Sequence, residues 1–465
     1  MKAIVNIKLL MVISLCILCG SCEYFVEVEV PNHKIVSETI FEEDETATRA
    51  MKGIYNELFN ASFSGGWSSS ITVLAGLSSD ILEPVNSENI TYGEFHKNEI
   101  SPDHSSNFNL WSSAYNIIYM TNSMLEGLAT SENLSADLRQ RLEGEARFVR
   151  AFTYFYLTNL YGDVPLVVDT DYRINSLVAR DSAGDVYGQV VADLERAMDL
   201  LPTEYDVSDR TTVNRFTAIA LRARMALYQQ NWEQAEALSS EIINQSSGYE
   251  ILQDLNNVFL ANSREAIWQI SPIGRGNILT STGEGQVFIG TSRSSLRLAN
   301  DFVENMDPQD KRLNHWVGHF SNESRNFFFP YKYKDFSSLN NITEYSMVLR
   351  LAEQYLIRAE ARAMLGDLEG AISDLDKIRN RAGLEELAVI NPGIGKEELL
   401  QLIMEERKQE LFAEWGHRWF DLKRTGRANE ILKDKTSLWN DTDVFYPIPE
   451  AERMKNPNLG QNPGY

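Results

Sequence analysis

The first side chains whose types and spacing could carry chemistry are the chain's three cysteines, Cys16, Cys19 and Cys22. Cysteines this close together can form a redox pair, bind a metal ion or accept a lipid group. Cys16 lies inside an apolar run from Leu9 to Leu18, and Cys19 and Cys22 follow it; a basic start and such a run are the pattern of a secretory signal peptide. The run is too short to span a membrane comfortably. A redox or metal site inside a signal peptide would be lost on cleavage, so the pattern favours a lipid site.

The residues around Cys22 make it the candidate for lipid attachment. It follows two small residues, and this arrangement resembles the lipobox of bacterial lipoproteins, although Cys19 stands where a leucine is usual. Cleavage before Cys19 would instead require Leu18 at the small-residue position. We therefore predict a signal peptide over residues 1–21 and Cys22 as the lipidated N-terminus of the mature chain. A single remaining cysteine excludes an intrachain disulfide, so the exported fold must depend on its hydrophobic core.

Two further pairs have spacings associated with chemistry. His315 and His319 are four residues apart, which on a helix would place two imidazoles on one face. Gly318 and the surrounding loop-like sequence argue against that helix. Glu406 and Glu410 have the same spacing and could be paired carboxylates for glycoside hydrolysis. Glutamates four apart on a helix rich in basic residues more often form ion pairs, so we predict neither a catalytic nor a metal site, and no cofactor.

A sugar-binding surface needs flat aromatic faces that stack on pyranose rings and polar side chains that bind the hydroxyl groups. Two loop regions combine these residue types. The candidate ligand contacts in the first region are Trp67, Asp80, Asn86 and Tyr92. The candidates in the second are Arg312, Trp316, Phe329 and Tyr331. The alternative is that several of these aromatic residues attach the loops to the core.

Charge excludes some partners. The net charge of −23, from 43 basic and 66 acidic residues, should repel nucleic acid and anionic membranes. Attachment to a membrane must then come from the lipid and not from basic patches.

The sequence reads as mainly α-helical. A segment from Ser135 has apolar residues every three or four positions and ends at Gly162 and Pro165, which predicts a long helix. Two segments starting at Leu221 and Ile357 align without gaps, and each reads as helix, short turn, helix. Small alanines at matching positions allow close helix packing, so the two segments resemble tetratricopeptide repeats.

Other regions read as irregular. We predict a long loop over residues 62–106 and an insertion with short strands over 270–345. The last residues, 446–465, are rich in proline and should form an extended tail on the surface.

Five blocks of the sequence together resemble the SusD/RagB family of outer-membrane lipoproteins of Bacteroidota. These blocks span residues 23–58, 143–167, 350–384, 403–427 and 446–465. The resemblance implies a mainly α fold of tetratricopeptide-like helix pairs, the SusD-like fold, with a loop-rich second half carrying short strands. It divides the mature chain into an N-terminal region, 22–210, and a C-terminal region, 211–465.

The resemblance also implies a function. Members of this family lie on the outer face of the outer membrane, cap a SusC-type TonB-dependent transporter and capture nutrients, most often glycans, without enzymatic activity. The acidic residues just after Cys22 are similar to export tags of surface lipoproteins. Two other possibilities stay open: a helical-repeat scaffold that binds only a protein partner, and a glycosidase that uses Glu406 or Glu410.

Overall fold

The computed structural model describes residues 40–465 except 206–208, 246–247, 273–279 and 340. The predicted signal peptide and Cys22 lie outside these residues. Within the described part of the chain, no helix is long and apolar enough to cross a membrane.

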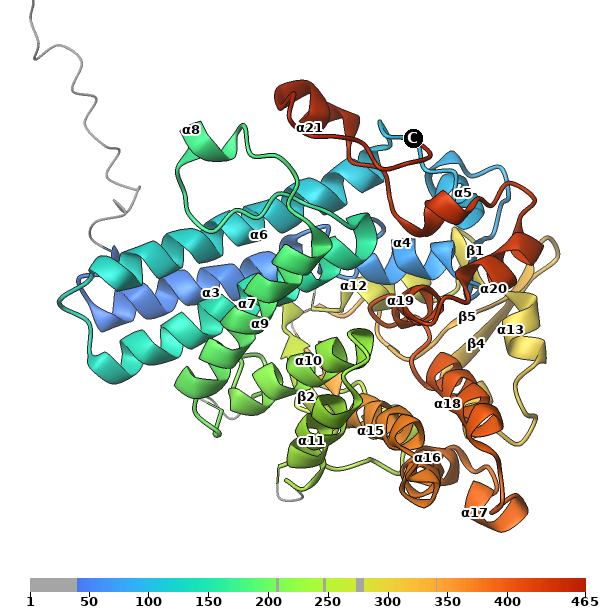
Figure 1. Cartoon of the computed structure of the whole chain (residues 1–465). Helices are drawn as coiled ribbons and strands as arrows, with labels where there is room; N and C mark the ends of the chain where they lie inside the picture. The colour runs from blue at the N-terminus through green and yellow to red at the C-terminus, as the bar shows by residue number, and fades with distance from the viewer. Residues whose placement is uncertain (1–39, 206–208, 246–247, 273–279, 340) are drawn as a thin grey trace, which may run out of the picture.

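Helices dominate the first half, where long helices lie side by side and shorter ones cover one end (Figure 1). In chain order they are α3 (Asp44–Asn60), α4 (Ile71–Ser78), α5 (Ile90–Lys97), α6 (Ser105–Thr130), α7 (Ala136–Tyr161), α8 (Tyr172–Asn175) and α9 (Ala183–Leu200). The predicted apolar face of α7 is buried, and the helix ends at Gly162, whose positive φ of 73° suits glycine.

The two predicted helix pairs form as expected. They are α10 (Arg215–Tyr228) with α11 (Trp232–Ile243), and α15 (Leu351–Leu365) with α16 (Leu368–Ala382). Ala223 and Ala235 of the first pair are buried in one cluster with Ile357 and Ala361 of the second. The small side chains let the helices approach closely, so the tetratricopeptide-like reading of these segments is confirmed.

The second half adds short helices and strands. The helices are α12 (Gly283–Phe288), α13 (Asn300–Glu304), α14 (Lys311–His315), α17 (Leu387–Ile390), α18 (Lys396–Glu410), α19 (His417–Arg424), α20 (Ala428–Lys435) and α21 (Glu450–Lys455). The strands are β1 (Leu82–Pro84), β2 (Ala266–Ile270), β3 (Leu296–Leu298), β4 (Val317–Ser321), β5 (Asn326–Pro330) and β6 (Ser346–Arg350). In the described residues they form three antiparallel pairs, β1 with β3, β2 with β6 and β4 with β5. The fold is therefore mainly α with short strands, as predicted.

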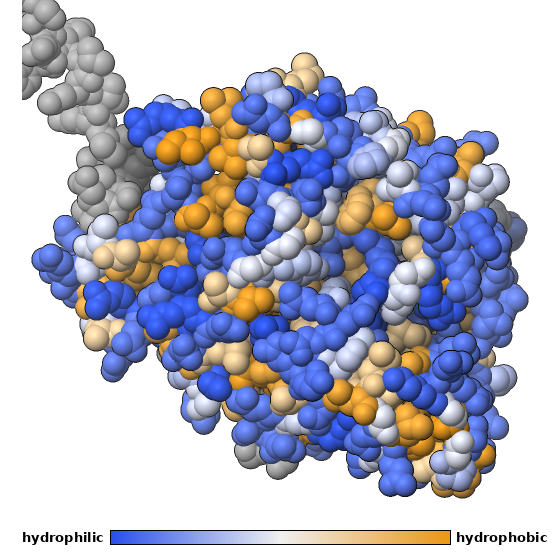
Figure 2. Space-filling model, viewed as in Figure 1, coloured by the Kyte–Doolittle hydropathy of each residue, from blue (hydrophilic) through white to orange (hydrophobic). Residues whose placement is uncertain are grey.

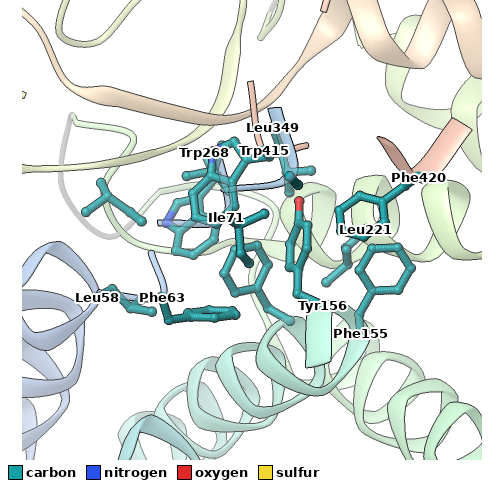
Figure 3. Packing of buried hydrophobic residues seen from close by; sticks show 14 of the residues in the cluster. Leu58, Phe63, Ile71, Phe155, Tyr156, Leu221, Trp268, Leu349, Trp415 and Phe420 are labelled. Atoms are coloured by element: carbon teal, nitrogen blue, oxygen red, sulfur yellow. The ribbon is translucent and has the colours of Figure 1, made fainter. Parts of the chain in front are cut away.

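The core is centred on aromatic side chains of α7. Tyr156 of α7 lies beside Trp415, with ring centroids 5.4 Å apart, and Trp268 of β2 closes the same cluster (Figure 3). The neighbouring Phe152 contacts both tryptophans with edge-to-face geometry at 5.1 Å. These contacts join the helical first half to the strand-bearing second half.

Two regions differ from the sequence prediction. Residues 62–106 do not form one long loop, because α4, β1 and α5 occur there and every residue of α4 is buried. Ser70 and Asn89 cap α4 and α5 by accepting hydrogen bonds from backbone N–H groups in the first turn of each helix. The C-terminal tail does lie over the surface, but it includes the short helix α21 and sends Tyr446 and Ile448 into the core.

Candidate functional site

A hollow of about 620 Å³ lies where the insertion meets the α5 region. It is lined by Tyr92, Gln286, Val287, Ile289, Thr291, Ser292, Arg293, Ser294, Ser295, Leu296 and Phe336. This set combines two aromatic rings, several hydroxyl groups, an amide and a guanidinium. We call it the insertion pocket.

The pairing of β1 with β3 brings the two sides of the insertion pocket together. Glu83 lies opposite Arg297 in this pair, and the Val85 N–H donates a hydrogen bond of 2.9 Å to the Ser295 carbonyl. Asn89 then caps α5 by accepting from the Tyr92 N–H at 3.0 Å. The Tyr92 side chain and the loop 291–295 therefore face the same space although they are distant in the sequence.

The β4–β5 hairpin supports the pocket from behind. Phe327 and Phe329 of β5 are buried in a small cluster with Ile289, which lines the pocket. The Phe329 ring lies so close to Gly290 and Gly318 that a Cβ at these positions would be 2.4 and 2.2 Å from it. Glycine at both positions lets the hairpin, the aromatic ring and the pocket loop pack together.

The pocket loop is held in place by its own hydrogen bonds. Ser294 Oγ accepts from the Thr291 N–H at 2.8 Å, and Thr291 Oγ1 accepts from the Arg293 N–H at 3.2 Å. Phe336, from a neighbouring loop, is 44% exposed and presents much of its ring to solvent. A fixed loop of hydroxyl groups beside an exposed aromatic ring can bind a ligand that has both hydroxyl groups and an apolar ring face.

Comparison with known proteins identifies the family. The sequence profile of the SusD family matches residues 87–465. This chain belongs to the SusD family. A SusD-like protein, P25 of Formosa agariphila, is 27% identical, with 95% of each chain covered. The starch-binding protein SusD of Bacteroides thetaiotaomicron is 35% identical over 126 residues, or 25% of this chain and 21% of that protein. A solved laminarin-binding SusD-like protein has a TM-score of 0.76 at 23% identity and covers 91% of this chain and 100% of its own.

Four of the candidate contacts of this SusD-family chain lie at or near the insertion pocket. Tyr92 lines it, although its side chain is mostly buried. Phe329 packs edge-to-face against Tyr331 behind the pocket wall, with ring centroids 5.7 Å apart. Asn86 is exposed just before α5, where its side chain accepts from the Glu88 N–H.

The other four lie in structural roles. Trp67 is partly buried, and its indole N–H donates to the Phe59 carbonyl at 3.2 Å. Asp80 forms ion pairs with Arg418 at 2.7 Å and Lys408 at 2.9 Å. Arg312 and Trp316 differ most from the expectation, because both side chains are 0% exposed. We therefore do not propose Arg312 or Trp316 as ligand contacts.

Phe336, Gln286 and Arg293 are not among the ligand contacts predicted from the sequence. Phe336 lies in the predicted insertion, six residues after the end of β5, and is exposed although Lys332 and Tyr333 between them are buried. Arg293 sits in a serine-rich stretch that has no motif. The signal for these residues is spatial: they become candidates only when α5 is placed opposite them.

The structure also shows where the histidine pair and the glutamate pair noted in the sequence lie. His315 ends α14 and His319 is on β4, so they do not share a helical face. Glu410 is fully buried and bonded to Arg350 and Arg381. Burial alone would raise the pKa of Glu410, but the guanidinium groups of Arg381, Arg350 and Arg312 hold it well below the usual value.

Glu284 of α12 is a buried carboxyl group beneath the pocket. One of its oxygens accepts from Ser346 Oγ at 2.5 Å, and the other has no hydrogen-bond partner among the described residues. Burial raises the pKa of Glu284 from 4.5 to about 7, and the nearby carboxylates of Glu344 and Glu414 add to this increase. The folded protein therefore binds this proton more tightly than the unfolded chain does.

This raised pKa predicts a pH-dependent stability. The contribution of Glu284 is fully present below about pH 4.5 and is lost as the pH rises through about 7. Glu284→Gln keeps a neutral group of similar shape at every pH. We expect its free energy of unfolding, measured relative to that of wild type, to be about 1–3 kcal/mol higher at pH 8 than at pH 5. Urea unfolding of both proteins at each pH measures this difference. Glu88→Gln, at an exposed position, is the control, and an equal difference at both pH values for Glu284→Gln contradicts the prediction.

Proposed function

We propose that this protein binds a glycan at the insertion pocket and delivers it to a SusC-type TonB-dependent transporter. The observation that carries the proposal is the pocket itself, in which the exposed ring of Phe336 stands beside a hydrogen-bonded loop of serine and threonine. A pyranose ring offers an apolar face to an aromatic side chain and hydroxyl groups to such a loop. A hollow of about 620 Å³ is in the range that small ligands occupy.

Family membership supports the class of ligand. One relative is named for starch binding and one structural neighbour for laminarin binding. We extend glycan binding, and not either particular glycan, to this chain. The transporter, the outer-membrane location and the lipid at Cys22 are parts of the same proposal and derive from the family resemblance and the signal sequence.

We propose that the protein binds its ligand without chemical turnover. Glu406 and Glu410, the carboxylates that could have hydrolysed a glycosidic bond, are 3% and 0% exposed. Arg312 contacts both of them, at 2.7 and 3.1 Å. Carboxylates buried in this way cannot reach a sugar, and Glu410, whose pKa the neighbouring guanidinium groups hold low, cannot supply the proton that hydrolysis requires.

The glycan proposal predicts a loss of affinity when the aromatic platform is removed. We expect Phe336→Ala to weaken glycan binding about tenfold, which corresponds to about 1.4 kcal/mol, because the stacking surface is lost. Isothermal titration calorimetry with the best ligand from a glycan array measures this change. Tyr172→Ala removes an aromatic ring that is 76% exposed and distant from the pocket, and it should leave affinity unchanged. Unchanged affinity in Phe336→Ala would place the glycan elsewhere.

A second candidate function is a scaffold that binds only a protein partner. The loop around α8 favours it, because this loop exposes apolar side chains, which gather in the upper left of Figure 2. Ile174 and Leu177 are 61% and 53% exposed, while Asn458 of the tail holds the loop by donating to the Leu177 carbonyl at 2.7 Å. A protein that captures the transporter but binds no glycan on an array would favour this function.

A further inference from the structure

The insertion pocket has an unusual charge for this protein. The chain has 66 acidic residues, yet none of the described residues that line the pocket is acidic, and Arg293 is among them. A hollow of about 580 Å³ beside α16 and α17 is lined by three acidic residues, Glu369, Asp376 and Glu386, and one basic residue, Lys377. A hollow of about 380 Å³ between α15 and α18 is lined by two acidic and two basic residues, Glu360, Glu430, Arg424 and Arg427. The insertion pocket is therefore a locally basic site on an acidic molecule.

Arg293 supplies the positive charge of this site. Its backbone N–H bonds to Thr291, but its guanidinium forms no hydrogen bond or ion pair with any residue that the structure describes. Each of the other described arginines uses its guanidinium in at least one such contact, as Arg297 does with Glu83 at 2.7 Å. An exposed guanidinium whose five donors have no partner among the described residues can bind an external anion.

A second guanidinium fixes the loop that carries Arg293. Arg325, in the turn between β4 and β5, donates from Nη1 to the Ser294 carbonyl at 3.2 Å and has no carboxylate partner among the described residues. The Arg325 guanidinium therefore places a second positive charge beside the loop 291–295. Three acidic side chains of the neighbouring segments have other partners: Glu83 pairs with Arg297, Glu284 accepts from Ser346, and Asp335 accepts from the Ser337 and Ser338 N–H groups.

We propose that the insertion pocket selects an anionic glycan, with a carboxylate or sulfate group of the sugar paired to Arg293. This inference rests on the proposed glycan-binding function and specifies the class of glycan. A protein of net charge −23 repels a polyanion at long range, so a local basic site is needed to hold one. Guanidinium matches the planar carboxylate and the sulfate oxygens through paired hydrogen bonds.

The test compares charged and neutral forms of the same polymer. Polygalacturonate and its methyl ester examine a carboxylate, while dextran sulfate and dextran examine a sulfate. Affinity electrophoresis and calorimetry give the dissociation constants at low and high NaCl. We expect one charged polymer to bind at least about tenfold more tightly than its neutral form, with weaker binding in high salt. Which pair shows the preference distinguishes carboxylate from sulfate.

Two variants that remove the same charge distinguish the effect of a charge in the pocket from the effect of the protein's overall charge. We expect Arg293→Gln to weaken binding of the charged polymer about tenfold or more. Arg49→Gln removes the same charge from the distant α3, where the arginine is exposed in an ion pair, and should have little effect. Equal losses in both variants, or none in Arg293→Gln, overturn the inference.

The outcomes also separate this inference from the proposed function. Equal or tighter binding of a neutral polymer, lost in Phe336→Ala but not in Arg293→Gln, overturns the anionic preference and leaves glycan binding standing. If neither these polymers nor a glycan array shows binding, the proposed function fails, and the inference fails with it.

Discussion

Replacing Arg350 with methionine is expected to lower the free energy of unfolding by about 3–5 kcal/mol. Arg350 ends β6 and is 1% exposed. Its guanidinium donates to Glu265 at 3.0 Å, to Glu410 at 2.5 Å and to Glu414 at 2.8 and 2.9 Å. Methionine would fill much of the space but would leave three buried carboxylates without this cation. Arg381 and Lys332 would still contact these carboxylates, but a buried cluster that lacks one of its cations costs far more than the loss of a surface ion pair.

Urea unfolding, followed by circular dichroism and by tryptophan fluorescence, measures the effect and shows whether the two transitions coincide. Arg49→Met is the matched control, because the Arg49–Glu45 pair joins side chains that are 73% and 70% exposed. We expect that substitution to change stability by less than about 0.5 kcal/mol. Similar values for the two variants would show that the buried cluster contributes no more than a surface pair.

The ion cluster around Arg350 explains why part of the site could not be predicted from sequence. The sequence predicts Arg312 and Trp316 as ligand contacts because a guanidinium and an indole occur together in a polar insertion. In the fold, Arg312 bonds to Asp310 and to Glu410 of the distant α18. Lys332 lies 4.7 Å from the Trp316 ring centroid. Residue type could not distinguish this internal polar core from a binding surface, since both use the same side chains.

The helical part was predictable for a physical reason. The helix pairs and α7 are determined by apolar spacing within one segment, and that spacing is visible in the sequence. The region 62–106 was missed because α4 is buried all round and has no polar face to show a helical period. The pocket depends on pairing between β1 and β3, which joins residues near 83 to residues near 297. Such long-range pairing leaves no local pattern.

Cys22→Ala is expected to abolish membrane attachment completely. The proposed anchor is a lipid on this one side chain, and no helix in the described part of the chain can span a membrane. The net charge of −23 disfavours adsorption to an anionic surface, so no electrostatic attachment should replace the lipid. Fractionation of cells that express wild type or the variant, with detergent partitioning of the membrane fraction, measures the change. The variant should move to the soluble fraction while keeping its helical circular dichroism spectrum.

Cys19→Ala is the control that locates the lipid. Cys19 precedes the proposed cleavage site, so its loss should leave a small residue in the signal peptide and a lipidated Cys22. This variant should remain in the membrane fraction and incorporate labelled palmitate as wild type does. If Cys19→Ala is released and Cys22→Ala is retained, the lipid is on Cys19 and the mature chain begins three residues earlier. If both variants stay in the membrane fraction, neither cysteine alone anchors the protein. A contact with another membrane component would then be sufficient to hold it.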